Sequence, residues 1–161
     1  MSVLDRFRLD GKKLFITGGS RGLGREMALA IAEAGADVIL TGRDEASLNN
    51  TARDIESLGR KATSIQADLA DPENCEAVCN QVLKDAGSID ILINNIGGRR
   101  IDVPVEKQSL QEWQQILDLN VTSTFYAPGL SGARCLIVSR GRVINIASVS
   151  GLVATKGHRR S

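Results

Sequence analysis

The sequence predicts an α/β fold built around a doubly wound parallel sheet. Strand and helix signals alternate without a break from residue 12 to about residue 120. The expected strands are continuously apolar, as in 38–40 and 91–93, which is typical of a parallel sheet covered by helices on both faces. A glycine-rich segment, 17–24, stands between the first strand and the first helix. These observations predict about five strands in the order 3-2-1-4-5, with a ligand crevice at their carboxyl ends.

Helix-opening and helix-closing residues stand at the expected element boundaries. Gly35, Gly59 and Gly87 are placed to close three helices, while Asp44 and Asp71-Pro72 are placed to open two. No repeat, linker or low-complexity segment interrupts the alternation, so 1–161 is expected to form a single domain. The expected strands lie near 13–17, 37–41, 62–66, 89–93 and 142–147, and the expected helices near 22–34, 45–58, 73–86 and 110–126.

The composition argues against several kinds of partner. Twenty basic and nineteen acidic residues leave a net charge of +1, which gives no electrostatic case for nucleic acid or an anionic membrane. The aromatic content of 3% argues against a base-stacking surface. The first ten residues contain no apolar signal core, and no later apolar run approaches the roughly 18 residues of a membrane span. We therefore expect a soluble, cytoplasmic protein without a nucleic-acid or membrane partner.

Cysteine and histidine are too few to support several common site chemistries. The three cysteines, Cys75, Cys79 and Cys135, fit a reducing compartment. Cys75 and Cys79 stand four apart on an expected helix, but no further ligand is near them in sequence, so buried thiols are favoured over a metal site. His158 is the only histidine, which leaves little basis for a Ser-His-Asp arrangement or a histidine-rich metal site. No metal is expected.

The glycine-rich turn at 17–24 is expected to bind the phosphates of a nucleotide. Glycine permits a tight turn and a close approach of the backbone to a pyrophosphate. The helix that follows offers unpaired N–H groups and the positive end of its dipole. A plain turn is the alternative, which the strand–turn–helix setting disfavours. The residues expected to contact the cofactor here are Gly18, Ser20, Arg21, Gly22, Leu23 and Gly24.

Arginine occupies the place where a fold of this kind selects between NAD and NADP. Folds that choose NAD usually have an acidic residue after the second strand, to bind the ribose 2′-hydroxyl. Here Gly42 and Arg43 follow that strand, and Arg21 lies in the glycine-rich turn. Two guanidinium groups would pair with a 2′-phosphate and favour NADP(H) over NAD(H). Two solvated surface arginines are the alternative.

Two further segments follow strands at the same edge of the expected sheet. Asp68 and Leu69 follow the third strand, where a carboxylate could accept the adenine amino group; an aspartate leading into a helix is the alternative. Asn94-Asn95-Ile96-Gly97 comes after the fourth expected strand, and all four residues, like Asp68 and Leu69, are expected to bind the cofactor. Adjacent asparagines tolerate unusual backbone angles and can tie neighbouring strands together, although an ordinary turn is also possible.

Taken together, these motifs resemble the short-chain dehydrogenase/reductase family, over about residues 9–157. Thr17, Gly18, Gly22 and Gly24 match its TGxxxGxG pattern, and 94–97 resembles its NNAG segment with Ile96 in place of alanine. Asn120 falls where the family has a catalytic-site asparagine, and Ser148 where it has the serine that hydrogen-bonds the substrate oxygen. The resemblance implies a Rossmann-like, NAD(P)-binding domain.

The resemblance also implies a reaction. Hydride passes between nicotinamide and a carbonyl or alcohol carbon of a small molecule, a tyrosine transfers the proton, and a lysine four residues later lowers the pKa of that tyrosine. Oxoacyl reductases and sugar or polyol dehydrogenases are the nearest classes. Full-length relatives are commonly homo-oligomers.

The chain departs from the family pattern near its end. The Tyr-x-x-x-Lys motif is expected about thirteen residues after Ser148, yet the only tyrosine is Tyr126 and Lys156 precedes the expected position. We therefore expect a C-terminally truncated domain with little or no catalysis, in which the strand at 142–147 forms an apolar edge. The alternative function is a catalytically inactive cofactor-binding remnant, or an interaction partner of a full-length paralogue.

A second departure lies at 127–132, where Pro128 and two glycines would break the long helix that the family has. A shifted reading frame over this stretch and over 157–161 is our hypothesis for both departures. Resequencing the gene from codon 126 past the stop tests it, because an unchanged sequence would eliminate a sequencing error.

Overall fold

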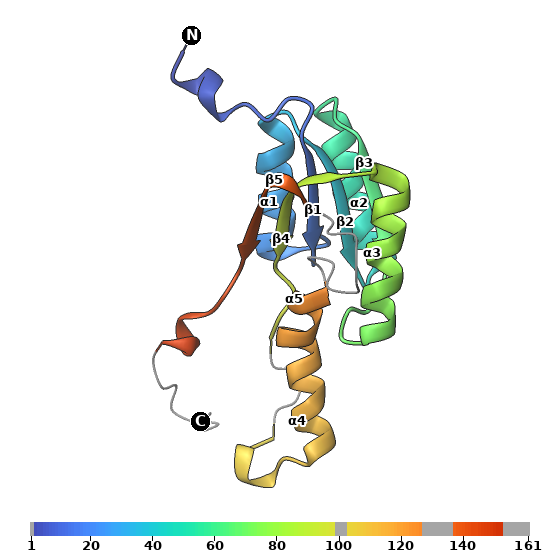
Figure 1. The fold of residues 1–161 in the computed structure, drawn as a ribbon, viewed down its shortest axis with the longest axis vertical. Helices are drawn as coiled ribbons and strands as arrows, with labels where there is room; N and C mark the ends of the chain where they lie inside the picture. The colour runs from blue at the N-terminus through green and yellow to red at the C-terminus, as the bar shows by residue number, and fades with distance from the viewer. Residues whose placement is uncertain (1, 99–102, 127–136, 153–161) are drawn as a thin grey trace.

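A single parallel sheet of five strands forms the centre of the molecule (Figure 1). The structure is a computed structural model and describes residues 2–98, 103–126 and 137–152. The strand order is β3-β2-β1-β4-β5, as the sequence predicts. The strands are β1 (Lys13–Thr17), β2 (Asp37–Gly42), β3 (Ala62–Gln66), β4 (Ile89–Asn94) and β5 (Ile137–Asn145).

Helices cover both faces of this sheet, with α1 and α2 on one face and α3 on the other. The longer helices are α1 (Gly22–Glu33), α2 (Glu45–Ser57), α3 (Pro72–Ala86) and α4 (Leu110–Leu117), followed by a π-helical turn η3 (Asp118–Thr122) and α5 (Ser123–Tyr126). Three short 3-10 turns are η1 (Leu4–Phe7), η2 (Val105–Lys107) and η4 (Val149–Gly151). Among the described residues, no helix combines the length and the apolar character needed to cross a membrane.

Successive side chains of each central strand enter different cores. In β1, Phe15 packs with Val82 of α3, whereas Leu14 and Ile16 pack with Leu48 of α2. All of these side chains are buried. A strand that is buried on both faces needs apolar residues at every position, which explains the continuous apolar runs of the sequence.

The helix ends lie where the sequence predicts. Asp44 and Asp71 accept hydrogen bonds from backbone N–H groups at the starts of α2 and α3, with Oδ1 to Ser47 N and Oδ1 to Glu73 N each 3.0 Å apart. Gly35, Gly59 and Gly87 follow α1, α2 and α3 with positive φ angles of 113°, 76° and 72°. Glycine adopts this conformation without the steric cost that a side chain would bring.

The expected helix at 110–126 is present but irregular. It begins at a capping box formed by Ser109 and Glu112 and changes to a π-helical turn at Asp118. Around that turn, the side chains of Asn120, Ser123 and Thr124 each hydrogen-bond the carbonyl oxygen four residues earlier. Such bonds compete with the regular backbone pattern, which accounts for the irregularity.

β5 is longer at its start than expected, running over 137–145 rather than 142–147. Its pairing with β4 shifts register between Ile89 and Ile91, and this irregularity lets the strand extend back to Ile137. β5 lies at the edge of the sheet, with Val143 46% and Ile144 44% exposed, as the sequence predicts. The predicted break at 127–132 lies outside the described residues.

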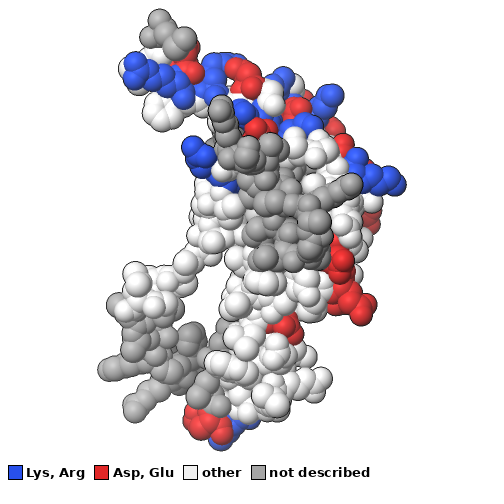
Figure 2. All heavy atoms as spheres, viewed as in Figure 1, with Lys and Arg blue, Asp and Glu red and all other residues white. Residues whose placement is uncertain are grey.

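Charged side chains on the face drawn in Figure 2 are intermingled, with no broad area of one sign. One ion pair connects the start of β1 to β4. Asp90 contacts Lys12 Nζ at 2.8 Å and accepts a hydrogen bond from the backbone N–H of Lys13 at 3.0 Å. Partial burial opposes ionisation of Asp90, but these hydrogen bonds and the two lysine charges together lower the pKa of its carboxyl group.

We predict that Asp90→Asn destabilises the chain by about 1 kcal/mol at pH 7 and by less in acid. Because the pKa is lowered in the folded state, the carboxylate stabilises the fold above its ordinary pKa of about 4, and that contribution is lost as the pH falls through the folded-state value. Urea unfolding of both proteins between about pH 7 and pH 3 measures the difference. Glu56→Gln is the control, since no described residue forms an ion pair with Glu56. A difference that does not vary with pH would contradict the prediction.

Candidate functional site

The glycine-rich turn connects β1 to α1 and lies next to the end of β2. The N–H groups of Gly18 and Gly19 both donate to the carbonyl oxygen of Thr41, at 2.8 and 3.0 Å. Gly18 and Gly22 have positive φ angles of 72° and 56°, so glycine is the favoured residue at both places. α1 begins at Gly22, directly after the glycine-rich turn. The backbone N–H groups at the start of the helix therefore have no partner within the helix.

Gly24 lets α1 pack against that turn. A Cβ atom at this position would lie 2.0 Å from the carbonyl oxygen of Gly18 and 2.6 Å from Nδ2 of Asn95. No side chain fits at such distances. The third glycine of the motif is therefore required by packing, while the first and the second are required by backbone conformation.

A reciprocal set of hydrogen bonds joins the ends of β1 and β4. Thr17 Oγ1 accepts from the N–H groups of Asn95 at 3.0 Å and Ile96 at 3.2 Å. In return, Asn95 Nδ2 donates to the carbonyl oxygens of Thr17 at 3.1 Å and Gly18 at 3.3 Å. On the other side, Asn94 Nδ2 donates to Oδ1 of Asn145 in β5 at 2.8 Å. The asparagine pair thus ties neighbouring strands together, as the sequence predicts.

These contacts surround a hollow of about 330 Å³ at the carboxyl ends of the strands. Most of the cofactor-contacting residues expected from the sequence line it. An adjoining hollow of about 290 Å³ shares Ser20, Arg21 and Arg43 with it and adds Asp44. Gly22, Leu23 and Gly24 lie in the first turn of α1. The first hollow is lined by Gly18, Ser20, Arg21, Gly42, Arg43, Asn95, Ile96, Gly97 and Gly98.

The two arginines expected to select the cofactor line the same hollow. Both are exposed, and neither guanidinium forms an ion pair within the described part of the chain. Their side chains are therefore available to an anion.

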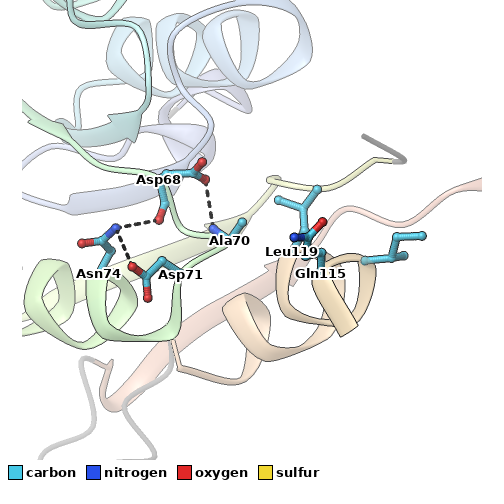
Figure 3. A pocket seen from close by; sticks show the side chains of 7 residues that line it. Asp68, Ala70, Asp71, Asn74, Gln115 and Leu119 are labelled. Carbon is cyan, nitrogen blue, oxygen red and sulfur yellow. Dashed lines mark hydrogen bonds between the residues drawn. The ribbon is translucent and has the colours of Figure 1, made fainter. Parts of the chain in front are cut away.

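Asp68 and Leu69 occupy different surroundings. Leu69 is buried in the core between the sheet and α3. Asp68 lines a separate pocket of about 480 Å³ between the start of α3 and the α4–η3 region (Figure 3). Its Oδ1 accepts from the N–H of Ala70 at 3.1 Å, and Asn74 Nδ2 donates to its carbonyl oxygen at 3.1 Å. Ile116 and Leu119 form the apolar wall of that pocket.

Asn120 and Ser148 are not brought together by the described arrangement. Asn120 lies in η3, where Oδ1 accepts from Gly98 N and Nδ2 donates to Gly98 O, both at 2.9 Å. Asn120 therefore connects η3 to the segment that follows β4. Ser148 follows β5 and is exposed beside η4, which Figure 1 shows well apart from η3.

Sequence reasoning missed three residues of the hollows. Gly42 and Gly98 line the larger one, and Asp44 the smaller one, although Asp44 was interpreted only as a helix-opening residue. Position relative to the strand ends is the signal for Gly42 and Asp44, because Gly42 ends β2 and Asp44 lies two residues beyond it. No local signal distinguishes Gly98 from other loop glycines.

Cys75 and Cys79 lie in the interior of the protein. Both belong to α3, and their thiols donate to the carbonyl oxygens of Leu69 at 3.2 Å and Tyr126 at 3.6 Å, respectively. No three metal-ligating side chains gather among the described residues. Burial raises the pKa of Cys75 to about 11 and that of Cys79 to about 12. Cys135 lies outside the described residues.

Comparison with known proteins agrees with the motifs and the fold. The sequence model of the family described as short chain dehydrogenase matches residues 12–159. The chain belongs to this family. Gluconate 5-dehydrogenase of Gluconobacter oxydans is 37% identical over 158 residues, which are 98% of this chain and 61% of that protein. A 3-oxoacyl-[acyl-carrier-protein] reductase of Aquifex aeolicus is 33% identical over 93% of this chain and 60% of its own length.

Solved structures of family members share the fold. A short chain dehydrogenase of Burkholderia cenocepacia in complex with NADP has a TM-score of 0.84 and 33% identity, covering 93% of this chain and 60% of its own. A short-chain type dehydrogenase/reductase of Mycobacterium marinum has a TM-score of 0.79 and 35% identity, covering 96% of this chain and 63% of its own. The chain thus spans about 60% of the length of the relatives that it matches.

The close packing of Gly24 predicts that a side chain at this position destabilises the fold. Gly24→Ala should destabilise the chain by about 1–3 kcal/mol, because the added methyl group overlaps the Gly18 carbonyl. Urea unfolding measures the change. Gly151→Ala is the matched control, since a Cβ there meets nothing within 4 Å. An alanine variant at Gly24 as stable as the unchanged protein would contradict this packing.

The burial of Cys75 and Cys79 predicts that their thiols are unreactive in the folded protein. In a Cys135→Ser background, Cys75 and Cys79 should not react with a disulfide reagent at pH 8 in the native state, and both should react in urea. The reason is that their pKa values of about 11 and about 12 leave almost no thiolate at that pH. Absorbance of the released thiol counts the modified groups. Rapid native modification of both would refute the buried placement.

Proposed function

We propose that this chain is the cofactor-binding part of an NADP(H)-dependent oxidoreductase that acts on a carbonyl or alcohol group of a small molecule. The observation that carries the proposal is the hollow at the strand ends, which combines glycine backbone, a helix N-terminus and two arginines without ion-pair partners among the described residues. The chain spans about 60% of the length of its relatives, so we propose the oxidoreductase activity for the whole protein of which this chain is the cofactor-binding part.

The residues of the hollow fit a dinucleotide. Gly22 and the rest of the first turn of α1 would bind the pyrophosphate, since the first N–H groups of a helix have no partner within the helix. Gly18 would leave room for the pyrophosphate, while its own N–H donates to Thr41. Ser20, Arg21 and Arg43 would bind a 2′-phosphate. Asn95, Ile96 and Gly97 would line the path toward the nicotinamide. Asp68, which lines the separate pocket beside α3, would accept the adenine amino group there, whereas Leu69 is buried in the core and would support that side without contacting the adenine.

The family pattern assigns the reacting end to two polar residues, which lie apart in the described structure (Figure 1). The cofactor would supply hydride chemistry when bound. Asn120 would hold a proton-relay water near Gly98, and Ser148 would hydrogen-bond the substrate oxygen. The tyrosine that transfers the proton in the family has no counterpart here, because the only tyrosine is Tyr126 and the fourth residue after it is Leu130.

NADP(H) is favoured over NAD(H) by charge. A 2′-phosphate carries close to two negative charges at neutral pH, and guanidinium groups bind such an anion strongly. The NADP complex of the Burkholderia cenocepacia relative supports the same choice. By analogy with the gluconate 5-dehydrogenase and the 3-oxoacyl-[acyl-carrier-protein] reductase, the substrate would be a sugar acid or an oxoacyl group.

We predict that the purified 161-residue chain binds NADPH saturably and that Arg43→Gln weakens binding about tenfold. Nucleotide fluorescence measures the dissociation constant. Arg53→Gln is the matched control, because Arg53 is an exposed arginine of α2 that lines neither hollow. Absence of saturable binding by a folded chain would refute the proposed function of this site.

Turnover separates the enzyme from the alternative function. NADPH oxidation with a panel of ketones, quinones and oxoacyl thioesters should stay far below the roughly 1–10³ s⁻¹ of ordinary enzymes, because no Tyr-x-x-x-Lys motif is present in the 161 residues. Binding without turnover supports a cofactor-binding protein, for which the exposed apolar strand β5 offers a place for a partner. Turnover at an ordinary rate would refute the expected impairment.

A further inference from the structure

The outer edge of β5 is apolar, and within the described part of the chain no further strand pairs with it. Figure 1 shows β5 at one side of the sheet, beside β4. Val143, Ile144 and Ile146 are each at least 37% exposed. Leu92 and Ile93, the partners of the first two in β4, are buried. An apolar edge that no charge, proline or covering element protects accepts another strand readily.

The hydrogen bonds between β4 and β5 determine which backbone groups of β5 face outward. The N–H of Ile146 donates to the carbonyl oxygen of Asn94 at 2.8 Å. Backbone groups of successive residues in a strand point to alternate sides, so Ile144 also bonds toward β4. The N–H and carbonyl groups of Val143 and Asn145 therefore face the open edge. They offer a second strand donors and acceptors at alternate positions.

The opposite edge of the sheet has a different character. β3 forms that edge, and Thr63, Ser64 and Gln66 make it polar. The side chain of Gln66 also donates to the carbonyl oxygen of Arg43 at 3.0 Å. Such a strand offers a second strand little apolar area for cross-strand packing. A contact that uses only the β5 edges of two copies closes on itself and does not extend into a fibre.

Charge restricts how two β5 edges can pair antiparallel about a twofold axis. Because the outward groups belong to alternate residues, the axis must pass beside one residue of each copy. An axis at Arg142 sets the two copies of its guanidinium directly opposite each other, which is destabilising. An axis at Val143 sets Arg142 against Ile144, and an axis at Asn145 extends the pairing past the end of β5.

An axis at Ile144 avoids each of these conflicts. It sets the two copies of Ile144 opposite each other in a pair without backbone hydrogen bonds, where side chains approach most closely. Val143 of each copy then lies opposite Asn145 of the other, so their outward groups exchange hydrogen bonds in both directions. Arg142 lies opposite Ile146, and no like charges within 142–146 meet.

We propose that the 161-residue chain forms a twofold dimer through its β5 edges, with Ile144 of each copy beside the axis. The two five-stranded sheets then join into one continuous sheet. The dimer goes beyond the proposed function and does not depend on the cofactor. A competing dimer would use the exposed apolar side chains of the α4–α5 region, which are Leu110, Trp113, Val121 and Phe125.

Sedimentation of the unchanged chain and of Ile144→Lys and Ile144→Glu tests this arrangement. The unchanged chain should sediment as a dimer at about 100 µM, since a small interface associates weakly. Each variant alone should raise the dimer dissociation constant at least about tenfold, because like charges then face each other across the axis. An equimolar mixture of the two variants should restore dimers to within about threefold of the unchanged chain, because position 144 then pairs opposite charges.

Val121→Lys is the control, because it places the same charge on the competing apolar surface. It should leave the dissociation constant unchanged. Ile144 is 44% exposed, so a charged side chain at this position can reach water, and thermal unfolding checks that each variant is folded. Hydrogen exchange of the unchanged chain needs no variant. The amides of Val143 and Asn145 should exchange more slowly at about 100 µM than at about 1 µM, because the dimer protects them.

The results distinguish the possible occupants of the edge. A folded chain that stays monomeric at about 100 µM overturns the proposed dimer and leaves the edge to a different polypeptide. A dimer that Val121→Lys disrupts and the Ile144 variants do not would place the contact on the α4–α5 region, which also overturns it. Loss of dimers in both Ile144 variants without recovery in the mixture overturns the twofold axis at Ile144. Exchange of the two amides that is independent of concentration contradicts strand pairing directly.

Discussion

The contact between Thr17 and Asn95 is the constraint on which the site depends. It fixes the end of β1 against the end of β4 through hydrogen bonds in both directions. Next to these joined strand ends, Gly24 lets α1 pack against the glycine-rich turn so closely that a Cβ atom would lie 2.0 Å from the carbonyl oxygen of Gly18. The hollow is therefore a result of strand pairing, and its lining residues come from three loops that the sheet aligns.

Local residue patterns explain most of what the sequence predicts correctly. Apolar runs locate the strands, because both faces of the sheet are buried. Asp44, Asp71 and three glycines locate helix ends, because capping depends on a few neighbouring atoms. The glycine-rich turn and the asparagine pair are found in the same way, since backbone geometry itself demands those residues.

The features that escaped prediction depend on contacts between distant segments. The register shift between Ile89 and Ile91 is set by pairing with β5, and Asn120 in the π-helical turn is hydrogen-bonded to Gly98, 22 residues away. Asp44 shows the limit most clearly. Its role as a cap can be inferred from neighbouring residues, whereas its place beside Arg21 is apparent only once the turn after β1 and the end of β2 are set next to each other.

The pairing of β1 with β4 also determines the order in which the chain can organise itself. Thr17 and Asn95 are 78 residues apart, so the hydrogen bonds that join them close a long loop. β1, α1, β2, α2 and β3 follow one another and can associate through nearby contacts, while β4 must return across the sheet to the far side of β1. Closure of distant contacts is slow relative to local ones. During synthesis on the ribosome, the hollow at the strand ends cannot form until β4 has emerged. Any ligand that binds there would stabilise only the chains in which this late step is complete.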